Sequence, residues 1–266
     1  MRVFIKTILK EKYKKYVSPL TLKMPYFGHW LYFPKGSAIV KTARLNGDFE
    51  PEIRKLMLQL TKENSTVFDV GTNIGWLSIP ILQTHPSVKV VSFEPSPSVL
   101  PYLRQTNAQS PHKSRWKIIE KAVGSEVKMT FFAQHGVGGD AYDGVISTGR
   151  AGKSESIEVP ITTLDAEWQA LGNPSVSLIK IDVEGFEMPV LVGAEKCINQ
   201  CRPAIITEWC EENLMTYDQP NHAIFTWAER MKYDIYVIPN LQPIRFKQDL
   251  EVALLSFENF LLMPQK

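Results

Sequence analysis

The chain has 266 residues, of which 44% are hydrophobic and 22% are charged, with 30 Lys and Arg against 28 Asp and Glu. This composition is typical of globular proteins and excludes a disordered chain, a collagen-like repeat and a disulfide scaffold. The net charge of +2 gives no broad positive field, so we expect no nucleic-acid partner. No apolar run reaches the roughly 18–20 residues that span a bilayer. The basic N-terminus lacks the apolar core of a secretory signal, so we expect a cytoplasmic protein.

The cysteines and histidines show no metal-ligand spacing. Cys197 and Cys201 lie four residues apart and Cys210 stands alone, which favours reduced thiols with structural roles. The five histidines are widely scattered. We therefore expect no bound metal.

Residues 1–48 are expected to form an appendage that precedes the main domain. Residues 1–17 carry apolar side chains at helical spacing opposite several lysines, which predicts a basic amphipathic helix. This helix either docks on the main domain or contacts a membrane surface, a glycolipid or another anionic partner. The aromatic stretch Tyr26–Leu45 is interrupted by residues 34–37 (PKGS), which predicts a β-hairpin with its turn there.

Residues 49–266 are expected to form one α/β domain with a doubly wound, mostly parallel sheet. A helix is predicted at 51–61, and strands then alternate with helices, which indicates right-handed βαβ units. The strands are predicted at 66–70, 89–94, 116–123, 177–182 and 204–209, and the helices at 74–84, 98–109 and 186–199. Two further strands, at 233–239 and 256–263, are predicted to pair as an antiparallel hairpin at the sheet edge. The long interval at about 125–162 predicts a small β-insertion.

The segment Val67–Gly75 (VFDVGTNIG) is the most informative part of the chain. An apolar strand ends in Asp69, and a turn containing Gly71 then leads into a helix. Glycines at 71 and 75 permit a sharp turn and close backbone approach, while the helix N-terminus offers free N–H groups to a ligand. The pyrophosphate fingerprint Gly-x-Gly-x-x-Gly is missing because Asn73 takes its middle position, which disfavours a nicotinamide oxidoreductase. The turn suits a ligand without a diphosphate, such as an adenosyl amino acid, whose ammonium group Asp69 would attract.

Carboxylates follow three other predicted strands. Glu94 ends the second strand, where it can accept both hydroxyls of a ribose. Asp182 and Glu184 follow the fourth strand, and Glu208 ends the fifth. Because the carboxyl ends of parallel strands meet at one edge, we expect these acids to surround a ligand there. Glu187 is expected to serve the first turn of the next helix.

Five ordered motifs carry a resemblance to a known family. They are DVGTNIG at 69–75, FEP at 93–95, AVG at 122–124, TLD at 163–165 and KIDVEGFE at 180–187. Together they resemble the FkbM family of S-adenosylmethionine-dependent methyltransferases, over about residues 50–263. Two departures stand out: Thr72 takes a position where alanine is common, and Pro80 is expected to kink the first helix.

The resemblance implies a seven-stranded class I methyltransferase (Rossmann-like) sheet that binds S-adenosyl-L-methionine. Asp69, Gly71, Asn73 and Gly75 would line the methionine part of the cofactor, and Glu94 would hold the ribose. Ala122 and Val123 would flank the adenine, and Asp182 would lie near the methyl group. Members of this family are similar to enzymes that methylate hydroxyls of sugars, glycolipids or secondary metabolites.

The reaction implied is an in-line displacement at the sulfonium methyl by an acceptor oxygen. A carboxylate that accepts the hydroxyl proton would assist it, with Asp182 as first candidate and Glu184 or Glu208 as alternatives. A divalent ion held by these acids is an alternative way to activate the hydroxyl. Amino-methylating enzymes usually carry an Asn/Asp-Pro-Pro-Tyr motif where Asp182 begins DVEG here, which disfavours that activity. A catalytically inactive binding module is the remaining alternative.

Overall fold

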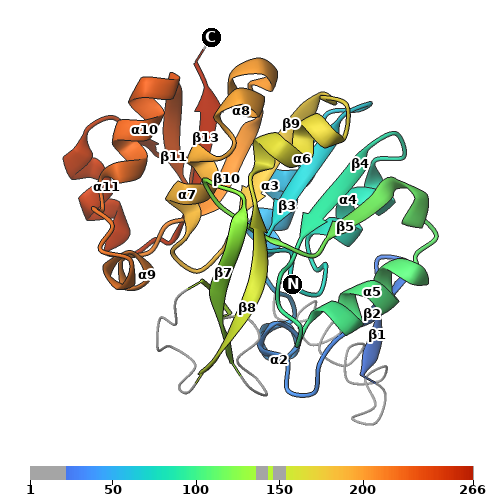
Figure 1. The fold of residues 1–266 in the computed structure, drawn as a ribbon. Helices are drawn as coiled ribbons and strands as arrows, with labels where there is room; N and C mark the ends of the chain where they lie inside the picture. Colours follow the sequence, from blue (N-terminus) through green and yellow to red (C-terminus); the bar gives the residue numbers. More distant parts are fainter. Residues whose placement is uncertain (1–21, 136–142, 146–153, 266) are drawn as a thin grey trace, which may run out of the picture.

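The computed structural model describes residues 22–135, 143–145 and 154–265 (Figure 1). In this part of the chain an eight-stranded sheet has the order β12–β11–β13–β10–β9–β3–β4–β5. Its strands are β3 (Thr66–Val70), β4 (Lys89–Phe93), β5 (Trp116–Ile119), β9 (Val176–Ile181), β10 (Ala204–Glu208), β11 (Tyr233–Val237), β12 (Pro243–Ile244) and β13 (Asn259–Pro264). The five strands from β5 to β10 are parallel, and β13, β11 and β12 are antiparallel. The expected class I methyltransferase sheet is confirmed, with the two-residue β12 added at its edge.

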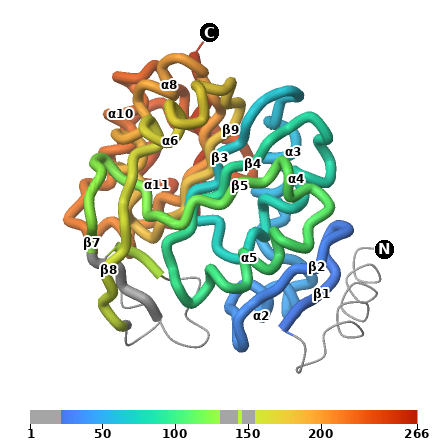
Figure 2. Tube along the Cα trace, turned by 45° about the vertical axis from the view of Figure 1, so that its right-hand side comes forward, coloured from blue at the N-terminus to red at the C-terminus, as the bar shows by residue number. Residues whose placement is uncertain are grey.

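Helices cover both faces of the sheet (Figure 2). The strands carry apolar side chains on both faces, and these pack against the two helix layers. One layer contains α2 (Ala38–Asn46), α3 (Pro51–Leu60), α4 (Ser78–Thr84) and α5 (Leu100–Ala108). The other contains α6 (Leu164–Ala170), α7 (Glu187–Val192), α8 (Glu195–Cys201), α9 (Glu211–Thr216), α10 (Ala223–Met231) and α11 (Lys247–Leu254). Alternate residues of β3 serve the two layers: Val67 packs in the first core and Phe68 in the second.

A small three-stranded sheet forms the expected insertion. Its strands are β6 (Ala122–Val123), β7 (Lys128–His135) and β8 (Ser154–Thr162), in the order β6–β8–β7. The single strand predicted at 116–123 was wrong, because it divides into β5 and β6. Between these strands, Glu120 pairs with Arg104 and Lys121 with Glu167, so the chain turns away from the main sheet.

The N-terminal hairpin has a different turn from the one predicted. Strands β1 (Lys23–Tyr26) and β2 (His29–Tyr32) are joined by Phe27 and Gly28, which have φ values of 46° and 77°. Two positive φ values in a two-residue turn match the twist of a hairpin. Residues 34–37 instead form a turn that leads into α2, since Ile39, Val40 and Ala43 form a buried helical face. The predicted helix at 1–17 and its predicted membrane contact lie outside the described residues. Within the described ranges, no helix is both long and apolar enough to cross a membrane.

Two helix predictions needed correction. Helix α4 begins at Ser78 rather than at 74, so Pro80 lies in its first turn, where no helical hydrogen bond is lost and no kink is required. The helix predicted at 186–199 is interrupted at Gly193, which separates α7 from α8. A Cβ atom at Gly193 would lie 1.9 Å from the carbonyl oxygen of Gly124, so the chain approaches its neighbour too closely for any side chain.

The C-terminal strands β11 and β13 pair antiparallel as expected. The segment between them holds β12 and α11 rather than a polar loop alone. The chain also contains α9, α10 and a short 3-10 turn at Lys113–Arg115 that were not predicted.

Asp165 of the TLD motif connects two helices. Its carboxylate accepts hydrogen bonds from the backbone N–H groups of Lys196 and Cys197, at 3.0 and 2.9 Å, in the first turn of α8. Thr163 caps α6 in the same way, through a bond from the N–H of Ala166. The motif therefore has a structural role: Thr163 and Asp165 accept hydrogen bonds from N–H groups in the first turns of α6 and α8, which have no acceptor within their own helices.

We predict that Asp165→Ala lowers the free energy of unfolding by about 1–2 kcal/mol, because two N–H groups of α8 lose their acceptor. Glu251→Ala, at an exposed site on α11, should change it by less than about 0.5 kcal/mol. Urea unfolding of both variants measures the difference. Equal stability of the two would show that the N–H groups find other acceptors.

Candidate active site

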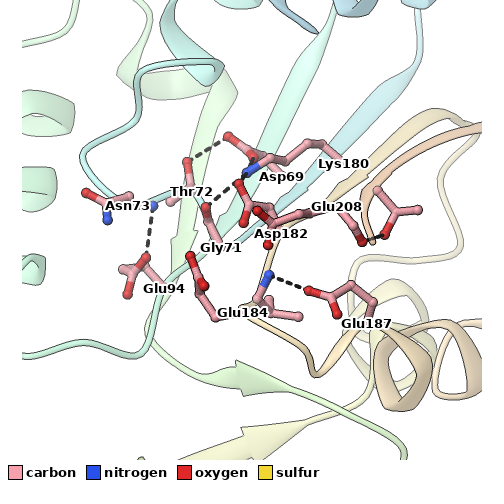
Figure 3. Close-up of polar contacts among 12 residues, drawn as sticks. Asp69, Gly71, Thr72, Asn73, Glu94, Lys180, Asp182, Glu184, Glu187 and Glu208 are labelled. Carbon is pink, nitrogen blue, oxygen red and sulfur yellow. Dashed lines mark hydrogen bonds and ion pairs between the residues drawn. The ribbon is translucent and has the colours of Figure 1, made fainter. Parts of the chain in front are cut away.

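The carboxyl ends of β3, β4, β9 and β10 surround a cavity of about 230 Å³. A smaller hollow of about 40 Å³ continues from it, and Gly71, Glu94, Asp143 and Asp182 line both. Figure 3 shows the predicted acids gathered at this edge of the sheet. Apart from Gly75, every predicted site residue lines one or both spaces: Asp69, Gly71, Asn73, Glu94, Ala122, Val123, Asp182, Glu184 and Glu208.

Strand register places a buried ion pair beneath the cavity. Asp69 on β3 lies directly opposite Lys180 on β9, and the Lys180 Nζ atom lies 4.0 Å from Asp69 Oδ1. Nζ also donates to Asp182 Oδ2 at 3.0 Å and to the carbonyl oxygen of Gly71 at 3.2 Å. Burial lowers the pKa of Lys180, but the carboxylates of Asp182, Asp69 and Glu50 outweigh this effect and raise it above its usual value. Lys180 is therefore a fixed cation that holds β3, β9 and the glycine turn together.

Asp69 shapes the turn that follows it. Its Oδ2 atom accepts hydrogen bonds from the hydroxyls of Thr72 and Ser78, at 2.7 and 2.6 Å. Gly71 has a φ of +78°, and a Cβ atom there would lie 1.8 Å from the carbonyl oxygen of Asp182. The turn can therefore take this path only with glycine at 71. Thr72, the departure from the usual alanine, supplies one of the bonds that hold the turn.

Glu94, which follows the neighbouring strand β4, binds the turn after β3 through a hydrogen bond. Its two oxygens accept the backbone N–H groups of Asn73 and Ser96, each at 2.9 Å, and the side chain is 5% exposed. Burial raises the pKa of Glu94 to about 7, although the two N–H bonds and Lys180 favour the ionised form. Each oxygen keeps a further lone pair, so the carboxylate can accept two ligand hydroxyls.

Ala122 and Val123 form a wall of the smaller hollow together with Phe93, Val183 and Phe186. The hollow is a narrow and largely apolar slot that opens beside Glu94 and Gly71. Such a slot suits a flat aromatic base, and the Glu94 carboxylate is among the groups that line it.

Gly75 lies apart from the cavity lining. It has a φ of +86°, and a Cβ atom there would lie 2.8 Å from the Trp116 ring. Its predicted contact with the cofactor stays a prediction. In the structure, Gly75 packs closely against Trp116 of β5.

The loop after β9 carries acids with different surroundings. Glu187 is buried and accepts the N–H groups of Val183 and Gly185, each at 3.1 Å, so it braces the loop before α7 rather than the first turn of that helix. Burial raises the pKa of Glu187 to about 7 against the effect of these bonds. Glu184 adopts a φ of 56° and is buried within the cavity wall. Asp182, at the end of β9, keeps its bond with Lys180.

Asn213 of α9 joins two of the predicted acids. Its Nδ2 atom donates to Glu184 at 3.2 Å and to Glu208 at 3.0 Å. Carboxylate oxygens of Asp182, Glu184 and Glu208 lie within 4.8 Å of one another, which is close enough for a shared cation. Because Lys180 and Asn213 already donate to these groups, the geometry alone gives no reason to assign a metal there.

Sequence reasoning missed two acids that line the larger cavity, Glu50 and Asp143, and also Asn213, which donates to two of the lining acids. Asp143 in the insertion accepts the hydroxyl of Ser96 at 2.6 Å and lines both spaces. Glu50 precedes α3 and lines the larger cavity. No sequence motif marks these positions. Each residue comes to the site because its segment packs there in the folded protein, which the local sequence does not indicate.

The fold and the site define a class I methyltransferase. A family model described as the methyltransferase FkbM domain matches residues 69–235, and the chain belongs to this family. It is therefore an S-adenosylmethionine-dependent methyltransferase.

Several individual proteins are similar to this chain. The chain is 26% identical to the 2-O-methyltransferase NoeI of Sinorhizobium fredii over 183 residues, which cover 64% of this chain and 74% of that protein. A Staphylococcus aureus structure provisionally described as a caffeoyl-CoA O-methyltransferase aligns with 98% of this chain and 100% of that chain, at 10% identity and a TM-score of 0.50, and shows the same fold. The methyltransferase FkbM from Methylobacillus flagellatus aligns over 98% of this chain at 11% identity and a TM-score of 0.47, and this chain spans 60% of its length.

The site fits the cofactor that the family uses. Asp69 Oδ1 is buried and accepts no hydrogen bond from any described residue, which suits a ligand ammonium group. Glu94 suits the ribose hydroxyls, and the slot beside Ala122 and Val123 suits the adenine. These roles of individual residues stay predictions.

We predict that Gly71→Ala unfolds the protein or lowers its melting temperature by more than 10 °C, because the new Cβ would overlap the carbonyl oxygen of Asp182. Gly172→Ala is the matched control, since Gly172 has a similar φ of +83° and nothing within 4 Å of its Cβ position. It should cost only the roughly 1 kcal/mol of a left-handed alanine. Thermal unfolding of both variants makes the comparison. Similar losses would mean that backbone strain alone, rather than the contact with Asp182, accounts for Gly71.

We predict that S-adenosylhomocysteine binds roughly tenfold more tightly at pH 8 than at pH 6. Ribose hydroxyls donate best to ionised Glu94, and the ionised fraction increases as the pH rises through its pKa of about 7. Calorimetric titration at several pH values measures the slope. Glu94→Gln should weaken binding by about 10–100-fold and flatten the slope, whereas the exposed Glu120→Gln should preserve both. An unchanged slope in Glu94→Gln would assign the pH dependence to another group.

Proposed function

We propose that the enzyme transfers the methyl group of S-adenosylmethionine to a hydroxyl of a sugar, glycan, glycolipid or secondary metabolite. The observation that supports this most directly is the match to NoeI, whose name describes a 2-O-methyltransferase. The acid-lined cavity beyond the cofactor residues supports it as well, because an alcohol needs an acceptor for its proton during transfer.

The bound cofactor supplies an activated methyl group on a positively charged sulfur. The protein must hold the acceptor oxygen in line with the methyl carbon and the sulfur, and such positioning can be worth about 7–11 kcal/mol. Asp182 lies at the junction of the two spaces, so its carboxylate is placed to accept a hydrogen bond from the acceptor hydroxyl. The ammonium group of Lys180 fixes the orientation of this carboxylate.

The larger cavity has a mixed surface. Ile39 and Thr42 of α2, together with Phe49 and Trp76, line it along with the carboxylates. Apolar and aromatic surfaces beside hydrogen-bonding groups suit the two sides of a sugar ring. We therefore propose that residues 38–50 contact the acceptor.

The test is incubation of the protein with S-adenosyl-L-[methyl-³H]methionine and a panel of methyl glycosides, nucleotide-sugars and glycolipids. Label in an alkali-stable ether on a hydroxyl supports the proposal. Label on nitrogen would instead support the amino-methylating alternative. Binding of S-adenosylhomocysteine without transfer to any hydroxyl of the panel or of a cell extract would favour the inactive binding module.

We predict that Asp182→Asn lowers methyl transfer by at least about 100-fold while S-adenosylhomocysteine binding falls moderately. The amide keeps the shape of the side chain but loses the charge that faces Lys180 and the acceptor hydroxyl. Asp234→Asn, an exposed aspartate on β11, is the control and should keep full activity. Full turnover by Asp182→Asn would exclude Asp182 from the reaction.

A further inference from the structure

Glu50 brings a carboxylate to the cavity from outside the strand ends. It lies in the turn before α3 and lines the cavity together with Asp182, Glu184 and Glu208. Asp182, Lys180 and Asp69 are near enough to act electrostatically on its carboxylate. Glu50 therefore faces the same space as the acids at the ends of β9 and β10.

The turn that carries Glu50 is held rigidly. Glu50 has φ 47° and ψ 48°, a left-handed conformation that is unfavourable for a residue with a side chain. Asp48 binds the guanidinium group of Arg54 through both oxygens, and the carbonyl oxygen of Phe49 accepts a bond from Trp76 Nε1 at 3.0 Å. These contacts on both sides of the turn fix a strained conformation that directs Glu50 into the cavity.

Other acids that line the cavity already accept hydrogen bonds or ion pairs from protein donors. Asp69 holds Thr72 and Ser78, Glu94 holds two backbone N–H groups, and Asp182 would lose its ion pair with Lys180 if it took a proton. Glu184 and Glu208 accept bonds from Asn213. The Glu50 carboxylate makes no hydrogen bond with any residue in the described part of the chain, so it can take a proton without disrupting a contact of the fold.

We propose that Glu50 is the catalytic base that accepts the proton of the acceptor hydroxyl. The acceptor oxygen forms a bond to the methyl carbon, and the carbon–sulfur bond breaks with its electron pair passing to sulfur. The hydroxyl proton passes to the Glu50 carboxylate and then leaves to solvent. This assignment rests on the proposed function, and it leaves Asp182 as the group that orients the hydroxyl.

The surroundings of Glu50 agree with this role. Burial, the Asp182 carboxylate and Asp69 raise the pKa of Glu50 to about 7, while Lys180 acts in the opposite direction. A carboxylate with a pKa near 7 is a better proton acceptor than one with an ordinary value and is still ionised in part at neutral pH. The remaining titratable groups that line the cavity are Glu94, Asp143, Glu184, Glu208 and Glu258.

The first test compares Glu50→Gln with Glu52→Gln, an exposed glutamate two residues further along α3. Glu50→Gln should lower kcat by about 10²–10⁴-fold on the methyl glycoside that the native protein methylates best. Its affinity for S-adenosylhomocysteine and its KM should stay within about threefold of the native values. Glu52→Gln should behave as the native protein. Native kcat for Glu50→Gln would overturn the proposal.

The pH profile separates proton transfer from a structural effect. Native kcat should rise with pH through an apparent pKa near 7, because the base must be ionised. Glu50→Gln should lose this rise, and Glu50→Asp, which keeps a shorter carboxylate, should retain it at a reduced rate. Retention of the rise in Glu50→Gln would assign the titrating group elsewhere and overturn the proposal.

A second measurement does not depend on the acceptor. NMR titration of ¹³C-carboxyl-labelled glutamates in the complex with S-adenosylhomocysteine should show a resonance that titrates near pH 7 and disappears in Glu50→Gln but not in Glu52→Gln. The absence of such a resonance would overturn the role of Glu50. If instead this resonance is present and no hydroxyl compound accepts the methyl group, the proposed function fails while the titratable carboxyl at Glu50 remains.

Discussion

The ion pair between Asp69 and Lys180 is the constraint on which the site depends. A lysine ammonium group buried between two strands is costly unless carboxylates and carbonyls surround it. The parallel register of β3 and β9 places Asp69 directly opposite Lys180. Asp182, two residues after Lys180, supplies a second carboxylate to the same ammonium group. A shift of one residue in either strand would turn these side chains to the opposite face of the sheet. The register that forms the sheet is therefore also the register that forms the active site.

The carboxylates of this site have different roles because the hydrogen-bond donors around each of them differ. Glu187 receives backbone N–H groups and braces a loop, whereas Glu94 receives them and retains lone pairs for a ligand. Asp182 is held by an ammonium group, and Glu50 receives no donor from the described residues. Burial raises the pKa of Glu50, Glu94 and Glu187 alike, so the hydrogen bonds rather than the pKa distinguish their roles.

The sequence allowed the positions of the parallel strands in the chain and the acids at their ends to be predicted. Both depend on local signals: apolar runs that end in Asp69, Glu94 or Asp182, and a glycine turn after the first of them. The interruption at Gly193 was not predictable in this way, because it arises from a close approach to Gly124, 69 residues earlier in the chain. The hairpin turn was misplaced because residues 34–37 contain stronger turn residues than Phe27 and Gly28. Glu50 was missed because its position depends on the pairing of Asp48 with Arg54 and on the indole of Trp76.

The wall formed by residues 38–50 has an evolutionary consequence. Several of these residues line the cavity although they precede the matched family region, 69–235, whose strand ends carry the acids of the site. If these residues contact the acceptor as proposed, selection can alter the wall residues other than Glu50 and change which molecule is methylated, while the residues that bind the methyl donor stay unchanged. Divergence among relatives is then expected to concentrate ahead of the first parallel strand, where changes leave the donor pocket untouched.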